Sequence, residues 1–241
     1  MKTMKKLLFI FIGLLSTSTM LMAQDAEPVA KTSKTPPKFF LAFSAGPAIP
    51  VGAFASKDIN ASSDAGLANL GYNLNLHSGY QISDYFGVTG NFLYSRFQMD
   101  QGAITRYLNS SGSGGVNATA DHWQYWGVIA GPMATLPVSD EIFFDFKAMG
   151  GYARANMPVI GFQLAGYPSA SLQTPEKWSD VFAWQLGTNM RYNFATNACL
   201  FANFDYNHME PVWKFNFNGE DLKVQQKMGV IDFTVGVGIT L

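Results

Sequence analysis

The sequence predicts an all-β protein, a closed eight-stranded antiparallel up-and-down transmembrane β-barrel. Three observations predict it: strands that alternate apolar and polar residues, connections that alternate between long and short, and a composition rich in aromatic residues and poor in charge. Only 14% of the residues are charged, whereas 20 Phe, 10 Tyr and 5 Trp are present. Ordinary globular domains have about 25% charged residues. The fold is therefore expected to present apolar side chains outward.

The stretch "YNLNLHSGYQI" at 72–82 shows the alternation most clearly. Tyr72, Leu74 and Leu76 share one face, and Asn73 and Asn75 share the other, as does His77. A period of two indicates a strand with two unlike faces. The polar face has amides but no Lys, Arg, Asp or Glu, which is unusual for a face in bulk water. We therefore expect the apolar face to contact lipid and the polar face to line the barrel.

The first 23 residues have the pattern of a secretory signal peptide. Three lysines precede the apolar run 7–15, and small and polar residues lead to Ala23. That run is too short to be a spanning helix. We predict cleavage after Ala23, a periplasmic lead-in at 24–37 and an outer-membrane barrel domain at 38–241. Exported proteins can form disulfides, but Cys199 is the one cysteine, so packing and backbone pairing must hold the fold.

Eight segments have strand character, and no run with helical periodicity competes with them. We expect strands at 38–46, 71–82, 86–97, 122–136, 142–154, 180–194, 199–208 and 227–241. The connections between them are about 24, three, 24, five, 25, four and 18 residues long. Long outer loops and tight periplasmic turns are typical of membrane barrels. Because an open sheet edge in hydrocarbon leaves backbone groups unpaired, the eight strands should close into a barrel.

These patterns resemble the family of small outer-membrane β-barrel proteins of the OmpX-like, OmpA-barrel and PorT-like kind. The features that carry the resemblance are "LMAQ" at the signal end, the alternating loop lengths and the last strand "VIDFTVGVGITL". The resemblance implies an outer-membrane location and insertion by the outer-membrane assembly machinery, which reads the last strand. Outer-membrane lipid and lipopolysaccharide would be its surroundings.

The inward parity of four successive strands places charges inside the barrel. These residues are Asp145, Lys147, Arg191, Asp205 and Asp232. An eight-stranded barrel has room inside for side chains and not for a solute channel. A lone charge there would be costly, so we expect Lys147 and Arg191 to form a salt-bridge network with the acids.

Two arginines follow tyrosines by two residues at the long-loop ends of their strands, Arg96 after Tyr94 and Arg154 after Tyr152. On the outer face each would lie just above an aromatic girdle, where contact with lipopolysaccharide phosphate is a hypothesis. The alternative is an ordinary solvated arginine.

The long loop at 155–179 contains Phe162, Tyr167 and Trp178, which are candidates for surface recognition by aromatic contacts. The Gly-, Ser- and Asn-rich stretch at 109–121 is expected to be too flexible to build a rigid site.

No catalytic residues, metal site or cofactor are predicted. His77 and Ser78 are adjacent on a strand and point to opposite faces, and His208 with Glu210 gives two possible metal ligands without a third. Without its signal peptide the chain has 13 basic and 17 acidic residues, which argues against nucleic acid as a partner.

We expect a structural or surface-interaction role through four long extracellular loops. A narrow channel, a lipid-modifying enzyme and a secreted soluble β-sandwich binding protein are the alternatives. A ten-stranded barrel is a further possibility if residues 156–166 add two strands. The sequence does not identify the extracellular ligand or the oligomeric state.

Overall fold

The fold lies within the unit Thr35–Leu241. This structure is a computed structural model that describes residues 36–59, 64–110, 115–164, 167–174, 176–217 and 220–241. The strands of the barrel are β1 (Phe39–Val51), β2 (Ala68–Ser83), β3 (Phe86–Met99), β5 (Trp123–Pro137), β6 (Ile142–Met157), β9 (Lys177–Ala195), β10 (Ala198–Met209) and β13 (Met228–Thr240).

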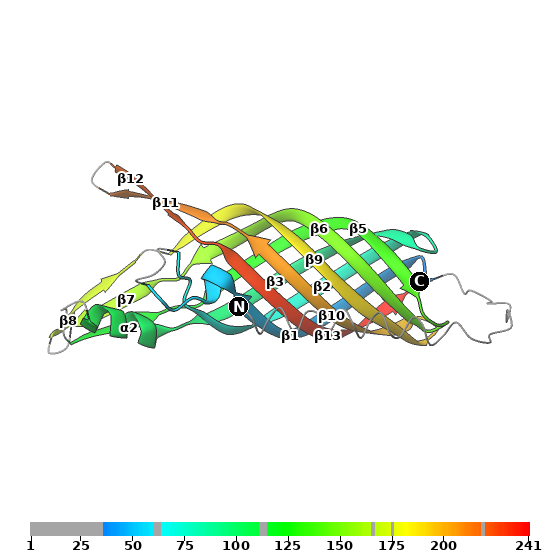
Figure 1. Cartoon of the computed structure of the whole chain (residues 1–241), viewed down its shortest axis with the longest axis horizontal. Helices are drawn as coiled ribbons and strands as arrows, with labels where there is room; N and C mark the ends of the chain where they lie inside the picture. Colours follow the sequence, from blue (N-terminus) through cyan, green and yellow to red (C-terminus); the bar gives the residue numbers. More distant parts are fainter. Residues whose placement is uncertain (1–35, 60–63, 111–114, 165–166, 175, 218–219) are drawn as a thin grey trace, which may run out of the picture. The chain divides into compact units, whose positions relative to one another are not determined.

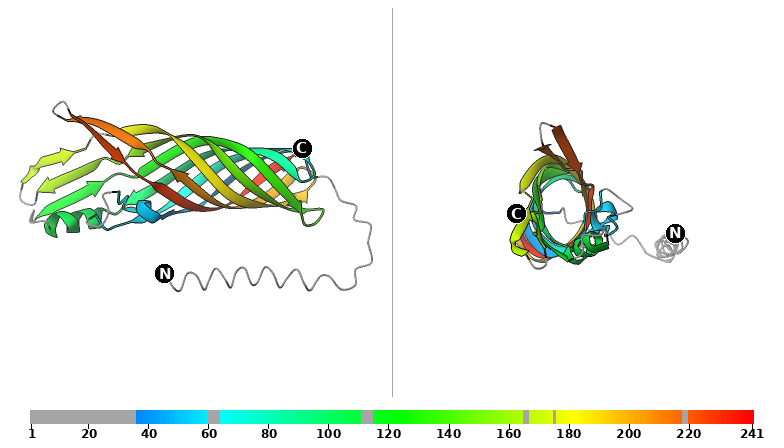
Figure 2. Two further views of the ribbon diagram at one scale, coloured as in Figure 1. Left: turned by 45° about the horizontal axis from the view of Figure 1, so that its top comes forward. Right: turned by 90° about the vertical axis from the view of Figure 1, so that its left-hand side faces the viewer.

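These eight strands form a closed antiparallel ring in the order β1-β13-β10-β9-β6-β5-β3-β2, which is visible in Figure 1 and, end on, in Figure 2. The ring closes where the first strand pairs with the last, from Phe40 opposite Thr240 to Val51 opposite Gly229. The predicted barrel and its eight strands are confirmed. The soluble sandwich is wrong, because one closed sheet replaces two packed sheets.

The two faces of the wall are as the alternation predicted. Asn73, Asn75 and His77 are buried inside, whereas Leu76 on the same strand is 46% exposed. On β13 the contrast is sharper, since Asp232 is 1% exposed and its neighbour Phe233 is 51% exposed. Apolar residues therefore cover the outside of the ring and polar residues line the inside.

Short turns join the strands at the end where β1 begins and β13 ends, and long connections join them at the other end (Figure 1). The long connections contain η1 (Gly52–Ala55), α2 (Gln101–Ser110), β4 (Val116–Ala120), β7 (Ile160–Leu164), β8 (Tyr167–Gln173), β11 (Val212–Phe217) and β12 (Glu220–Gln225). Among the described residues, no helix is long and apolar enough to cross a membrane.

Two of these connections differ from the expectations. Ile160–Leu164 does not enter the ring but pairs with β4 in a separate three-stranded sheet, β4-β7-β8, so the ten-stranded alternative is wrong. Part of the 109–121 stretch is also more ordered than its composition suggests, because Val116–Ala120 forms β4. This strand pairs with β7, which comes from a different long connection far along the chain, and composition does not reveal that pairing.

Inside the barrel, the buried side chains form two apolar clusters and a set of polar and charged residues. Toward the long connections lies a layer of large apolar residues that includes Phe54, Phe97, Trp123 and Trp213. Toward the short turns lies a smaller apolar layer made of Phe40, Ala42, Met133, Cys199 and Phe201. Most of the other buried side chains inside the ring are polar or charged, and they form the polar layer. Some of them lie in register with members of the apolar clusters: Arg191 faces Phe201, and Gln185 faces Met149.

Candidate functional site

The polar layer is organised by the strand register, which places buried charges in rows across neighbouring strands. In one row Asp232 on β13 faces Asp205 on β10, which faces Gly187 on β9, which faces Lys147 on β6. Gly187 has no side chain, so Lys147 reaches across it and its Nζ lies 3.0 Å from Asp205 Oδ1 and 3.2 Å from Oδ2. A Cβ at position 187 would overlap Asp205 Oδ1. The glycine therefore makes room for this ion pair.

A second ion pair joins Arg191 on β9 and Asp145 on β6. Arg191 Nε lies 2.6 Å from Asp145 Oδ2, and Nη2 donates a hydrogen bond of 2.9 Å to Oδ1. Thr135 Oγ1 and Asn189 Nδ2 also donate to this carboxylate, at 2.6 and 2.8 Å. The guanidinium lies 4.6 Å from the ring centre of Phe40. Such pairing and hydrogen bonding compensate the cost of burying both charges.

Asp232 differs from the other two acids, because its described partners are amides and not a cation. Its Oδ2 accepts hydrogen bonds from Asn73 Nδ2 at 3.0 Å and Asn207 Nδ2 at 2.6 Å. Among the described residues, the ion pairs inside the barrel are Lys147–Asp205 and Arg191–Asp145. Four of the five predicted interior charges thus form two ion pairs. The fifth, Asp232, accepts hydrogen bonds from two asparagines.

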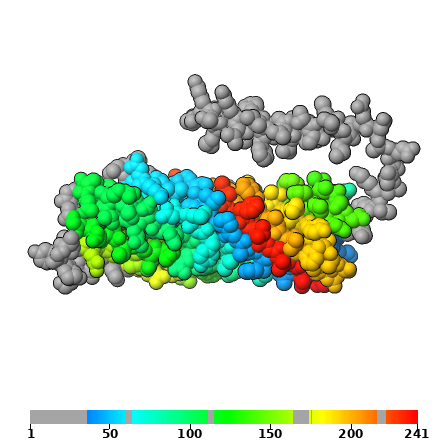
Figure 3. Space-filling model, turned by 90° about the horizontal axis from the view of Figure 1, so that it is seen from below, coloured from blue at the N-terminus to red at the C-terminus, as the bar shows by residue number. Residues whose placement is uncertain are grey.

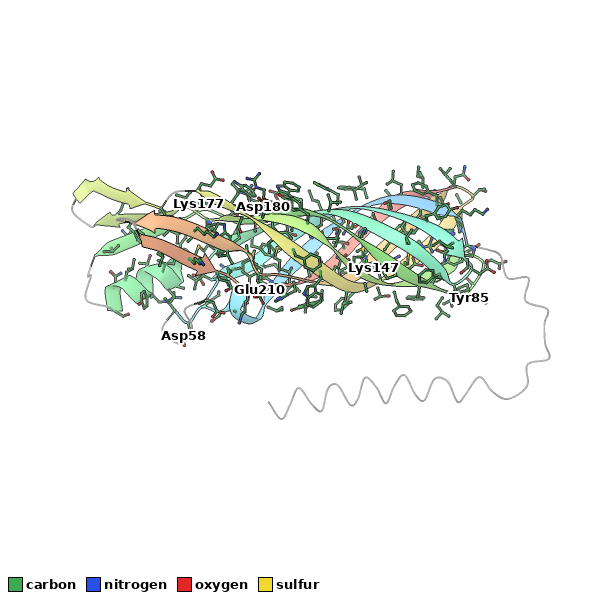
Figure 4. All side chains as sticks on the ribbon, turned by 90° about the horizontal axis from the view of Figure 1, so that it is seen from above. Asp58, Tyr85, Lys147, Lys177, Asp180 and Glu210 are labelled. Atoms are coloured by element: carbon green, nitrogen blue, oxygen red, sulfur yellow. The ribbon has the colours of Figure 1, made fainter. Side chains whose placement is uncertain are left out.

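Figure 4 locates Lys147 along the barrel wall, Tyr85 at the end with short turns, and Asp180 toward the other end. The chemistry available to the interior is limited by its burial. His77 is stacked against Phe201, with ring centres 6.5 Å apart, and Cys199 is buried. Within the described part of the chain, no group of three His, Cys, Asp or Glu residues could hold a metal ion. The described interior is therefore lined by buried polar and apolar side chains.

The two arginines proposed to meet lipid phosphate lie on the outer face but in unlike surroundings. Arg154 is paired with Asp180, with Nε 3.4 Å from Oδ1, and the same carboxylate accepts a hydrogen bond from Tyr152. Arg96 instead has its Nη2 3.2 Å from His122 Nδ1. Its Nε is buried without a hydrogen-bond partner. The positive charge of Arg154 is therefore compensated locally, while that of Arg96 has no carboxylate partner among the described ion pairs.

The three aromatic residues proposed for recognition do not form one described patch. Phe162 on β7 packs against a small apolar cluster that includes Leu67 and Ile104. Trp178 on β9 is 37% exposed, and the guanidinium of Arg154 lies 5.8 Å from its ring centre. The side chain of Tyr167 lies outside the described residues. Trp178 alone of the three is described as exposed to the surroundings.

No family model matches the chain, and no curated protein matches it. Among solved structures, Neisserial surface protein A is 14% identical with a TM-score of 0.49, and the match covers 85% of this chain and 97% of that one. Ail, the attachment invasion locus protein of Yersinia pestis, is 15% identical with a TM-score of 0.43, covering 85% and 99%. A major outer membrane protein from Thermus thermophilus is 11% identical with a TM-score of 0.45, covering 85% and 98%.

Three residues that shape the interior were not predicted from the sequence. Phe54 and Trp213 come from the long connections and are buried in the apolar layer near the barrel mouth, where they contact Trp123 at ring-centre distances of 5.6 and 5.9 Å. No alternating pattern marks either residue. Gly187 lies on the predicted inward face beside Lys147 and Asp205, so its parity was a usable signal.

Proposed function

We propose that this protein is an integral outer-membrane barrel that acts as a sealed anchor and presents its structured long connections at the cell surface for interaction. It is proposed not to be an enzyme. The signal-peptide pattern supports export, and the apolar outer face supports membrane insertion. Soluble monomers rarely expose contiguous apolar patches above a few hundred Å². Here every barrel strand contributes large exposed apolar residues, among them Phe43, Leu76, Phe92, Val128, Phe146, Leu186, Phe204 and Phe233.

The filled interior is the observation that carries this proposal. The interior contains two apolar clusters and, packed among them, two ion pairs and several hydrogen-bonded amides. Ions crossing the barrel would have to displace both apolar clusters and break buried pairs. This packing favours the plug over the narrow channel.

The structured connections supply the second half of the proposal. They carry a helix, a three-stranded sheet and the β11–β12 hairpin, all at the end away from the short turns (Figure 2). Loops of barrels face the cell exterior when the termini are periplasmic. Ordered elements cost less entropy to bind through than flexible loops do. These connections are therefore suited to contact with a partner outside the cell, and insertion by the outer-membrane assembly machinery remains part of the proposal.

Single-channel recording of the folded protein in planar bilayers tests the sealed interior. We expect no steady conductance, with a general porin in the same bilayers as the positive control. A large steady conductance would overturn the plug.

Membrane fractionation with heat-modifiable gel migration tests the location. The expected result is a detergent-extracted protein of the outer-membrane fraction that migrates faster before heating than after it. Recovery in the soluble fraction without detergent contradicts the membrane proposal.

A further inference from the structure

The buried charges inside the barrel do not balance. Among the described residues, the buried Asp, Glu, Lys and Arg side chains are Asp145, Lys147, Arg191, Asp205 and Asp232. Both bases are paired with an acid, in the pairs Lys147–Asp205 and Arg191–Asp145. One acid, Asp232, is left over, and it is only 1% exposed. A buried carboxylate without a cation is costly, because water no longer solvates its charge.

Asp232 on β13 faces a second acid and not a cation, since it lies directly opposite Asp205 on β10. The Lys147 ammonium, on β6, contacts both oxygens of Asp205 and Oδ1 of Asn203, so its three donors have acceptors already. The other titratable group that acts electrostatically on Asp232 is Tyr125 on β5, whose hydroxyl is uncharged at neutral pH. Like charges directly opposite on neighbouring strands are destabilising. An ionised Asp232 would therefore be both unpaired and repelled.

Two buried oxygens at this position lack hydrogen-bond partners, and they belong to side chains that already bond to each other. Asn73 Nδ2 donates to Asp232 Oδ2 at 3.0 Å, whereas Asn73 Oδ1 and Asp232 Oδ1 have no partner. The amide also donates to Ser95 Oγ at 2.8 Å, and Asn207 Nδ2 donates to the same Oδ2 of Asp232 at 2.6 Å. The two orphaned atoms are both acceptors, so a hydrogen atom is the component that they lack.

The first strand makes room for this contact between its two neighbours. β1 lies between β2 and β13 in the ring, and Figure 3 shows β1, in blue, beside β13, in red. The residues of β1 opposite the two partners are small: Gly46 faces Asn73, and Ala48 faces Asp232. The Asn73 side chain can therefore cross β1 to reach the acid.

We propose that Asp232 holds a proton at neutral pH and forms a cyclic acid–amide pair with Asn73. In this pair Asp232 Oδ1–H donates to Asn73 Oδ1, and Asn73 Nδ2 donates back to Asp232 Oδ2. One proton gives partners to two buried acceptors and removes the excess charge of the interior. The inference goes beyond the sealed anchor, because a barrel that holds this proton loosens in alkaline solution, where Asp232 and Asp205 would both be ionised.

Asparagine substitutions distinguish the two facing acids by urea unfolding in phosphatidylcholine vesicles. Asp232→Asn replaces a neutral acid by a neutral amide that can also donate to Asn73 Oδ1, so at neutral pH it should unfold no earlier than the wild type. Asp205→Asn is the matched control, because it leaves the Lys147 ammonium buried without a carboxylate. The control should raise the unfolding equilibrium constant at least about a hundredfold.

The pH dependence of unfolding provides a second measurement. An aspartate in the unfolded chain is ionised above about pH 4, so unfolding of the wild type releases the proton of Asp232. The folded state then binds one proton more than the unfolded state, and stability falls as pH rises. Relative to Asp232→Asn, the unfolding equilibrium constant of the wild type should increase about tenfold for each unit from about pH 5 to about pH 7.

Infrared spectroscopy detects the proton in the wild type itself. The folded protein, labelled with carbon-13 at the aspartate carboxyl, is measured at neutral pH in micelles of an ester-free detergent, whose molecules have no carbonyl band. We expect one isotope-shifted C=O band of a protonated carboxyl in the wild type and its loss in Asp232→Asn.

The proposal is overturned if the wild type lacks this band, if the band survives in Asp232→Asn, or if Asp232→Asn unfolds as early as Asp205→Asn. Equal pH dependence of the wild type and Asp232→Asn also contradicts it. Stabilisation by sodium chloride over choline chloride at equal ionic strength, present in the wild type and absent in Asp232→Asn, would indicate a bound cation in place of the proton. These outcomes do not bear on the sealed barrel, which conductance and fractionation test separately.

Discussion

Replacing Gly187 with alanine should destabilise the barrel far more than the same change at a neutral position. A Cβ at 187 overlaps Asp205 Oδ1, so the carboxylate must move away from Lys147, whose Nζ is now 3.0 Å from it. Breaking a buried ion pair costs about 3–5 kcal/mol. Removing a glycine from a strand returns about 0.5–1 kcal/mol. The net loss of unfolding free energy is therefore about 2–4.5 kcal/mol.

Urea unfolding of the protein in lipid vesicles, followed by tryptophan fluorescence, measures this loss. Gly90→Ala is the matched control, because it also removes a strand glycine and its Cβ would make only ordinary contacts, at 3.5 Å from Ser78 Oγ and 3.8 Å from Ile129 O. We expect the control to be more stable than the wild type by about 0.5–1 kcal/mol. If Gly187→Ala unfolds as late as the control, the buried carboxylate tolerates displacement and the reasoning about the ion pair is wrong.

Three further outcomes follow from the described contacts. Asp205→Ala should cost about 3–5 kcal/mol by urea unfolding, whereas the double change Lys147→Met with Asp205→Leu should cost much less, because it leaves no buried unpaired charge; equal losses would contradict this. The hydrogen bond from Lys57, with the smaller effect of the Ala103 amide, lowers the pKa of Asp100. The contribution of this pair to stability should therefore be full above the pKa of Asp100 in the unfolded chain and lost as pH falls through its lower pKa in the folded protein. Carboxyl NMR titration of Asp100 checks this, and Lys57→Met should raise its titration midpoint. An unchanged midpoint would refute the reasoning. Cys199, which is fully buried, should resist a maleimide in the folded barrel and react after unfolding, and rapid labelling of folded protein would contradict its burial.

Much of the barrel could be predicted from the sequence, because the side-chain period of a strand is a local property. Leu76 and His77 are neighbours, yet their parity alone assigns them to opposite faces, and the structure agrees. Parity also put Lys147 and Asp205 on the inner face. It could not state that they meet across Gly187, because that depends on the register of three strands and not on any one of them.

The connections could not be predicted in the same way. Phe54 and Trp213 fill the barrel mouth from segments that have no repeating pattern. The pairing of Val116–Ala120 with Ile160–Leu164 joins two five-residue pieces that are far apart in the sequence. Pieces this short carry too little periodicity to reveal a partner. The unlike surroundings of Arg96 and Arg154 likewise depend on a residue from another strand, Asp180.

For the proposed membrane insertion, the seam between β1 and β13 constrains the order of assembly. β1, the first strand of the chain, has β2 as one neighbour in the ring. Its other neighbour is β13, the last strand, since Phe40 lies opposite Thr240. Until the C-terminal strand arrives, both edges would present unpaired amides and carbonyls to any surrounding lipid, at several kcal/mol for each group. Insertion strand by strand is thus disfavoured, and a polypeptide truncated before Met228 should be a target for periplasmic proteolysis instead of a smaller stable barrel.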